Sequence, residues 1–252
     1  MWNNLRGKIL LSLALGLLVI SGLFIYADLT QLLQVLAGFR WGYIPLILGL
    51  TVFNYTMRFL KWQYYLRLIG VTGLNRLDSL LISWGGLSTV ITPGKVGEWV
   101  KSYLLQEASA VPISRSAPII IAERLTDGIA MALIASAGIA AFGLGWQVLL
   151  ATLLLATVIV AITQHRPLAE HLLGWGEKLP LISGLMRHVH QFYESAHILL
   201  RPKNLLVGVS LGTIAWSGEC VAFYLVLLGL GLEGSPLLLL QAAFIFAVSL
   251  LA

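Results

Sequence analysis

The chain has 252 residues, of which 58% are hydrophobic and only 11% are charged. A soluble domain carries roughly a quarter charged residues, so this composition excludes a water-soluble protein and indicates a multi-pass membrane protein. The net charge of +5 does not indicate nucleic-acid binding, because the basic residues flank apolar runs, where they meet anionic lipid headgroups. The single cysteine, Cys220, excludes an intrachain disulfide and a cysteine-rich zinc site.

The first two apolar runs both have the length of a membrane span, which takes about 20 residues. Residues 9–26 form the first run. Arg6 and Lys8 precede it and no small-residue cleavage site follows, so we interpret residues 1–40 as an uncleaved signal anchor with an external loop. The second run, residues 41–57, has aromatic and basic residues at its ends, which is typical of membrane interfaces. They are Trp41 and Tyr43 at one end and Arg58, Lys61, Trp62, Tyr64 and Tyr65 at the other.

The third apolar run covers residues 128–163 without a single charge and is too long for one span. Gly143 and Gly145 predict a turn that divides it into a two-helix hairpin. Residues 205–232 and 236–252 complete the apolar runs. The predicted fold class is therefore an all-α polytopic transmembrane helix bundle.

Residues 77–106 are ambiguous, because they are apolar at first, break at a Pro-Gly pair and then carry charges. If the segment crosses the membrane once, basic residues collect in external loops. If the segment turns back, Arg40 is the only basic residue that remains in an external loop. Because cytoplasmic loops collect Lys and Arg, we predict a re-entrant segment and a cytoplasmic amino terminus. Lys95, Lys101 and Arg124 then lie at membrane depth, where basic groups are usually functional.

Residues 164–204 interrupt the apolar pattern and hold all five histidines. Apolar residues recur at helical spacing from Ile182 to Leu200, which predicts an amphipathic helix on the cytoplasmic interface. His188 and His190 are two positions apart and point to different faces of a helix, so we expect surface histidines rather than metal ligands.

A weak internal repeat relates residues 65–70 to residues 224–229, at an offset of 159. A basic loop follows the first copy and an acidic loop the second, so the copies are expected to face opposite sides of the membrane. Inverted repeats with broken helices occur in transporters whose binding site lies at the midplane. A chance alignment of two Leu-rich helices is the alternative.

The repeat predicts a division of the chain after the signal anchor. We assign residues 41–163 to the first repeat, residues 164–204 to a cytoplasmic linker and residues 205–252 to the start of the second repeat. The chain stops where a second Pro-Gly break is due, so we expect a fragment of a longer protein.

The first candidate site surrounds the Pro-Gly break. A helix that restarts after it directs free N–H groups and its positive dipole end toward the membrane interior, where Lys95 adds a charge suited to a phosphate. Glu98 lies three residues from both Lys95 and Lys101 and could pair with either. The alternative is a plain turn with a snorkelling lysine. The candidate residues are Pro93, Gly94, Lys95, Gly97, Glu98 and Lys101.

Glu123, Arg124 and Asp127 form the second candidate site. At ~1.5 Å per residue from the interface, Glu123 lies about 12 Å deep and Asp127 about 18 Å deep in a core of ~30 Å. These charges need partners, and Lys95, Lys101 and Arg124 are the available cations. Either the set is an ion-pair network that holds helices together, or it lines a polar path, which we favour.

Glu219 is a further embedded acid, with Arg58 as a candidate partner across the repeat. The motifs of metalloproteases, serine hydrolases, phosphate loops and dinucleotide folds are absent, so we expect no enzyme activity, no cofactor and no metal. An intramembrane acid–base enzyme that uses Glu98, Glu123 or Asp127 is the minor alternative.

The chain contains five motifs: YLRLIG at 65–70, TPGKVGE at 92–98, VKSYLL at 100–105, AERLTD at 122–127 and WxxE at 216–219. With them, residues 41–252 resemble the lysylphosphatidylglycerol synthase transmembrane-region family of flippase-like membrane proteins. The resemblance implies inverted re-entrant repeats and movement of a lipid with a polar or glycosylated headgroup between leaflets. It places in the translocation site Pro93, Gly94, Gly97, Glu98, Glu123, Arg124 and Asp127. The family's second Pro-Gly break and a soluble aminoacyl-transferase domain are missing, so lysyl transfer is not expected.

The leading hypothesis is a flippase-like transporter in the plasma (inner) membrane. Its substrate is an anionic phospholipid or a polyprenyl-phosphate-linked sugar. The main alternative is a non-transporting partner that docks a glycosyltransferase or lipid synthase through residues 164–204. A homo-oligomer is compatible with both hypotheses.

Overall fold

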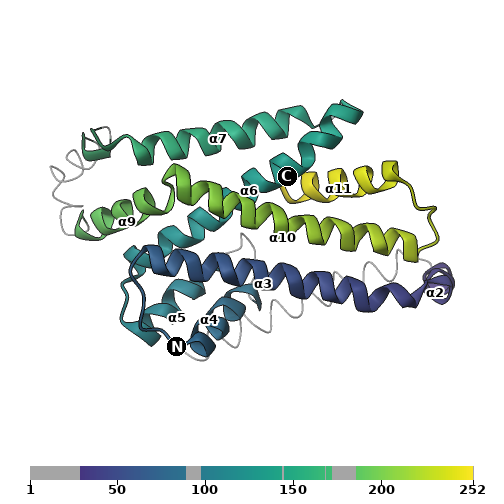
Figure 1. Cartoon of the computed structure of the whole chain (residues 1–252), viewed down its shortest axis with the longest axis horizontal. Coiled ribbons are helices and arrows are strands. Elements are labelled where there is room, and N and C mark those ends of the chain that lie inside the picture. Colours follow the sequence, from purple (N-terminus) through teal and green to yellow (C-terminus); the bar gives the residue numbers. More distant parts are fainter. Residues whose placement is uncertain (1–28, 89–97, 144, 168, 172–185, 252) are drawn as a thin grey trace.

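The computed structural model describes residues 29–88, 98–143, 145–167, 169–171 and 186–251. Within these ranges every regular element is a helix, which confirms the predicted all-α class (Figure 1). The first described helix is α2 (Leu29–Gly38). The predicted signal anchor and the Pro-Gly break lie outside the described residues.

Four helices of the described part are long and apolar enough to cross a membrane. Two of them begin with a proline in the first turn, which is favourable because the missing N–H would have no helical partner there. The spans are α3 (Ile44–Leu68) with the preceding 3-10 helix η1 (Trp41–Tyr43), α6 (Ile113–Phe142), α7 (Trp146–Gln164) and α10 (Pro202–Gly229).

Helix α3 is longer than the predicted span of residues 41–57, because it continues to Leu68. Lys61, Trp62 and Tyr65 are almost completely buried, so the prediction that they lie at a membrane interface was wrong. The lysine interrupts the hydropathy pattern, but it faces an acid on another helix.

The predicted break in the long apolar run is confirmed between α6 and α7. α6 ends at Phe142, and Gly143 and Gly145 have φ of +68° and +82°. This left-handed conformation favours glycine and ends a helix. The shorter apolar helix α11 (Pro236–Leu251) follows α10 and packs against α6.

Spans α3 and α7 run in one direction and spans α6 and α10 in the other, so the ends of the spans gather at two levels (Figure 1). We call the level that holds the end of α3 and the starts of α6 and α10 the basic end. Arg115 donates to the Ile69 carbonyl there, so the chain between α3 and α6 leaves from and returns to this end. The basic residues at this end of the bundle are Arg67, Arg76, Arg115, Arg166, Arg187, Arg201 and Lys203.

The chain between α3 and α6 contains two short helices, α4 (Arg76–Ser88) and α5 (Val100–Ser109). They pack against each other, and α5 also packs against α6. Trp62 Nε1 on α3 donates to Ser79 Oγ on α4 over 3.0 Å. These contacts hold α4 and α5 beside α3 and α6 within one bundle.

Helix α9 (Met186–Leu199) confirms a helix within the predicted amphipathic segment. Its buried face packs mainly on α6, and Leu199 is fully buried in the core. Tyr193 donates from its hydroxyl to the Thr163 carbonyl at the end of α7 over 3.3 Å. The helix is therefore held across the basic end.

Helices α3 and α10 cross in antiparallel directions and make the most extensive helix–helix contact of the described part. Asn54 donates to the Ala215 carbonyl over 3.0 Å, and these two residues are 161 positions apart. Gly70 after α3 and Gly231 after α10, with φ of +77° and +94°, have the same separation. The two helix ends therefore match at 161, slightly beyond the 159 of the sequence alignment.

Candidate functional site

Three charged residues lie in the middle of the apolar helix α6, at Glu123, Arg124 and Asp127. Glu123 and Asp127 are one helical turn apart and share a face. Both are more than nine-tenths buried. An unpaired charge in such a position is strongly destabilising, so each carboxylate needs a cation from another helix.

Asp127 pairs with Lys61 of α3. Lys61 Nζ lies 2.5 Å from Asp127 Oδ1 and 3.1 Å from Thr126 Oγ1. Lys61 is only 1% exposed, so its whole side chain lies inside the bundle. Gly212 of α10 leaves room for the pair, because a Cβ there would lie 3.3 Å from Asp127 Oδ1 and 3.4 Å from Lys61 Nζ.

Arg58, almost one turn before Lys61 on α3, is a second cation near Asp127. Its Nη2 lies 4.0 Å from Asp127 Oδ2, and its guanidinium stacks over the Trp216 ring at 5.4 Å from the centroid. Oδ2 has no hydrogen-bond partner among the described residues. The Arg58 contact is therefore the looser of the two at Asp127.

Glu219 of α10 does not join these ion pairs in the described part of the chain. Arg58 acts on it electrostatically, but the ion pair of Arg58 is with Asp127. The predicted pairing of Arg58 with Glu219 is therefore reduced to a longer-range attraction across α3 and α10.

Glu123 pairs with Lys101 of α5, which is one of the cations that the sequence analysis considered. Lys101 Nζ donates to Glu123 Oε2 over 2.9 Å and lies 5.2 Å from the centroid of the Trp62 ring. A Cβ at Gly86 of α4 would collide with the alkyl chain of Lys101. The glycine thus lets the lysine pass between α4 and α6 to reach its acid.

Arg124 pairs with Glu98, which precedes α5. Its Nε donates to Glu98 Oε2 over 2.6 Å, and Nη2 contacts Oε1 as the second arm of a fork. Glu98 is 3% exposed, whereas a third of the Arg124 side chain is exposed. Of the two predicted alternatives for Glu98, the pair with Lys101 is not formed, because Lys101 pairs with Glu123 and Arg124 pairs with Glu98. The alternative with Lys95 lies outside the described residues.

The predicted residues thus separate into three groups. Glu98, Lys101, Glu123, Arg124 and Asp127 form one network of interhelical ion pairs at α5 and α6, extended to α3. Glu219 forms no ion pair with this network in the described part of the chain. Pro93, Gly94, Lys95 and Gly97 lie outside the described residues.

The sequence interpretation missed Lys61 as a member of the network and assigned Arg58 to another acid. Both had been placed at a membrane interface. Arg58, Lys61 and Tyr65 recur at spacings of three and four, which puts them on one face of α3. Tyr65 Oη lies 3.4 Å from Thr126 Oγ1, so the polar stripe along α3 was the signal for this contact with α6.

The ion pairs present guanidinium and ammonium groups to carboxylates, an arrangement that also suits other anions. Among the described residues, no group of three His, Cys, Asp or Glu side chains could hold a metal ion. A guanidinium that binds a carboxylate through two N–H groups has the geometry to bind a phosphate in the same way. Arg124 offers this fork at a partly open position.

A family model for the lysylphosphatidylglycerol synthase transmembrane region matches residues 9–252. The chain belongs to this family. The match confirms the resemblance carried by the five motifs and extends it back to residue 9. Searches of curated proteins and of solved structures give no significant match. Membership of the lysylphosphatidylglycerol synthase transmembrane-region family fits a membrane protein that acts on lipids.

Proposed function

We propose that this chain moves a lipid with an anionic headgroup, either a phospholipid or a lipid-linked sugar, between the leaflets of the plasma membrane. The observation that carries the proposal is the set of buried ion pairs made by Glu123, Arg124 and Asp127 of the apolar span α6. Charged groups inside a membrane are costly, and they commonly line the path of a polar substrate. Membership of a family that fits lipid-directed membrane proteins agrees with this role.

Arg124 is the residue that best suits the phosphate of the moving headgroup. Its side chain is one-third exposed, while its carboxylate partner Glu98 is buried. In the absence of lipid, Glu98 neutralises the guanidinium and lowers the cost of holding it in the membrane. A phosphate that enters then replaces Glu98 as the acceptor of the fork, while the acyl chains remain in the bilayer.

The second step of the path is Arg58, at the loose end of the Asp127 pair. The 4.0 Å contact and the Oδ2 atom without a partner among the described residues leave this guanidinium the most easily displaced in the network. Its stacking on Trp216 keeps it in position when the carboxylate is exchanged for a phosphate.

A re-entrant segment between α3 and α6 supplies the opening to this path in our proposal. The Arg115–Ile69 contact supports it, because both ends of the intervening chain meet at the basic end. The excess of Lys and Arg at this end favours a cytoplasmic location and a cytoplasmic amino terminus.

The experiment that tests the proposal replaces one ion pair at a time by neutral amides. The full chain is reconstituted into liposomes with fluorescent phosphatidylglycerol, and the loss of dye from the outer leaflet is followed. In Glu98→Gln/Arg124→Gln the cation is removed without leaving an unpaired acid, so the protein should fold while flipping falls by at least tenfold.

The matched control is Arg166→Gln/Glu194→Gln, which removes an exposed ion pair of 3.4 Å at the basic end. We expect it to keep the wild-type rate, because exposed pairs contribute little to stability. Full flipping by the folded Glu98→Gln/Arg124→Gln protein would refute the proposal. Loss of function in the control alone would favour a docking role for residues 164–204, and a new lipid product would indicate an enzyme.

A further inference from the structure

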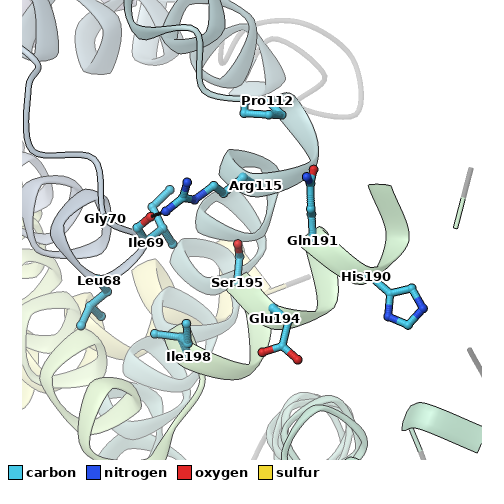
Figure 2. Close-up of a pocket in the computed structure, with 10 residues that line it drawn as sticks. All are labelled: Leu68, Ile69, Gly70, Pro112, Arg115, His190, Gln191, Glu194, Ser195 and Ile198. Carbon is cyan, nitrogen blue, oxygen red and sulfur yellow. Dashed lines mark hydrogen bonds between the residues drawn. The ribbon is translucent and has the colours of Figure 1, made fainter. Parts of the chain in front are cut away.

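A cavity lies at the basic end, outside the ion-pair network. It has a volume of about 530 Å³ and lies between the end of α3, the start of α6 and the outer part of α9 (Figure 2). Its polar wall contains Arg115, Gln191 and Ser195, and its apolar wall contains Leu68 and Ile69. The cavity is therefore large and amphipathic.

The depth of this cavity matches the headgroup level of a bilayer. The span that contains α3 ends at Leu68, and the next span begins at Ile113, so the cavity between them lies where hydrocarbon gives way to polar headgroups. An apolar wall on one side and polar groups on the other suit a lipid with a charged headgroup and an apolar acyl chain.

Arg115 gives the cavity its charge. Its Nη2 donates to the Ile69 carbonyl at the end of α3, and Figure 2 shows the side chain extended toward Ile69 and Gly70. A Cβ at Gly70 would lie 2.9 Å from this nitrogen. Within the described part of the chain Arg115 has no acidic partner at ion-pair distance, and its other N–H groups remain available as donors.

The rest of the wall does not cancel this charge. Glu194 is the acid that lines the cavity, and it pairs with Arg166 over 3.4 Å. Gln191 accepts from Ser114 Oγ over 2.7 Å through Oε1, and its amide NH₂ donates to no other described residue. The wall thus offers an anchored guanidinium and an amide donor, both of which suit phosphate oxygens.

We propose that this cavity binds the phosphate-bearing headgroup of a phospholipid from the leaflet at the basic end. Arg115 holds the phosphate, Gln191 donates to a second oxygen, and the first part of an acyl chain lies against Leu68 and Ile69. This inference depends on the proposed function only for the class of lipid that binds. It would load the lipid about 12 Å from the depth of Glu123, along the same helix α6.

The test measures protection of a cysteine in the cavity wall, using the full chain in detergent, where no transport occurs. Ile198→Cys is placed in a Cys220→Ala background, and its rate of alkylation by a maleimide is measured. Dihexanoyl-phosphatidylglycerol at ten times its Kd should slow alkylation by roughly tenfold. Dihexanoylglycerol, which lacks the phosphate, and inorganic phosphate, which lacks the chains, should each protect much less.

Two arginine variants locate the phosphate. Arg115→Gln should abolish the protection, and Arg115→Lys should keep only part of it, because the lysine retains the charge but not the fork. Arg67→Gln, an exposed arginine near the same helix end, should behave like the parent.

Absence of protection in the parent, or equal protection by dihexanoylglycerol, would overturn the inference. Equal protection by inorganic phosphate would also overturn it, in favour of a free-phosphate site. Flipping without protection would refute this site alone, and protection without flipping would refute the proposed function alone.

Discussion

Substitution of Lys61 by methionine tests whether the network stabilises the bundle. Methionine has a similar length and can fill the same space, but it cannot neutralise Asp127. Lys61 and Asp127 are 1% and 6% exposed, so the lost interaction is not screened by water. The substitution therefore isolates the charge from the packing.

The expected loss follows from the geometry of the pair. Removal of one partner of a buried ion pair costs about 3–5 kcal/mol, because the other charge is left alone. Arg58 remains 4.0 Å from Asp127, and two unit charges at that distance attract by about 4 kcal/mol at an effective dielectric constant of about 20. Arg58 thus compensates in part, and we expect Lys61→Met to lower the free energy of unfolding by about 3 kcal/mol, the lower end of the range.

The assay is reversible unfolding in mixed micelles, followed by far-ultraviolet circular dichroism. Asp127→Asn added to Lys61→Met removes the stranded carboxylate, so the two effects should be coupled by about 2 kcal/mol. Lys203→Met, at an exposed lysine, should change stability by less than about 0.5 kcal/mol. Equal stability of Lys61→Met and Lys203→Met, or strictly additive effects in the double variant, would refute the pairing of Lys61 with Asp127.

Three further predictions concern packing and orientation. Gly212→Ala should destabilise the fold by about 1–3 kcal/mol, because its Cβ would press on the Lys61–Asp127 pair, whereas Gly49→Ala, with open space around it, should not; equal unfolding curves would contradict this. Asn54→Ala should cost about 1 kcal/mol through loss of the bond between α3 and α10, and an unchanged unfolding curve would argue against that bond. In a cysteine-free background, Lys203→Cys should react with an impermeant thiol reagent from the cytoplasmic side and Glu233→Cys from the other side, and the reverse pattern would refute the orientation.

The sequence was sufficient to predict the class of the fold and the turn within the long apolar run. The turn followed from Gly143 and Gly145, whose backbone conformation has a local cause. The end of α3 could not be predicted in this way, because Lys61 is charged and a charged residue in the sequence indicates the end of an apolar span. Its burial depends on an acid that lies 66 positions later in the chain.

The candidate site was predicted in the same incomplete way. Glu123, Arg124 and Asp127 were expected to need partners, because isolated charges are unstable in an apolar span. Helical spacing predicts which residues share a face, but it does not predict which helix packs against that face. Only the two nearby lysines were therefore considered as partners of Glu98, although it pairs with Arg124 of α6.

Composition, hydropathy and motifs by themselves determined that this is an all-α membrane protein of one family with charges buried in its spans. These properties follow from local chemistry, since each apolar run must satisfy its own backbone in the bilayer. The tertiary structure alone decided that Lys61 and Arg58 serve Asp127, that Lys101 serves Glu123 and that Arg115 lines a separate cavity. Ion pairs between helices depend on which faces pack together, and that choice is made by the whole bundle.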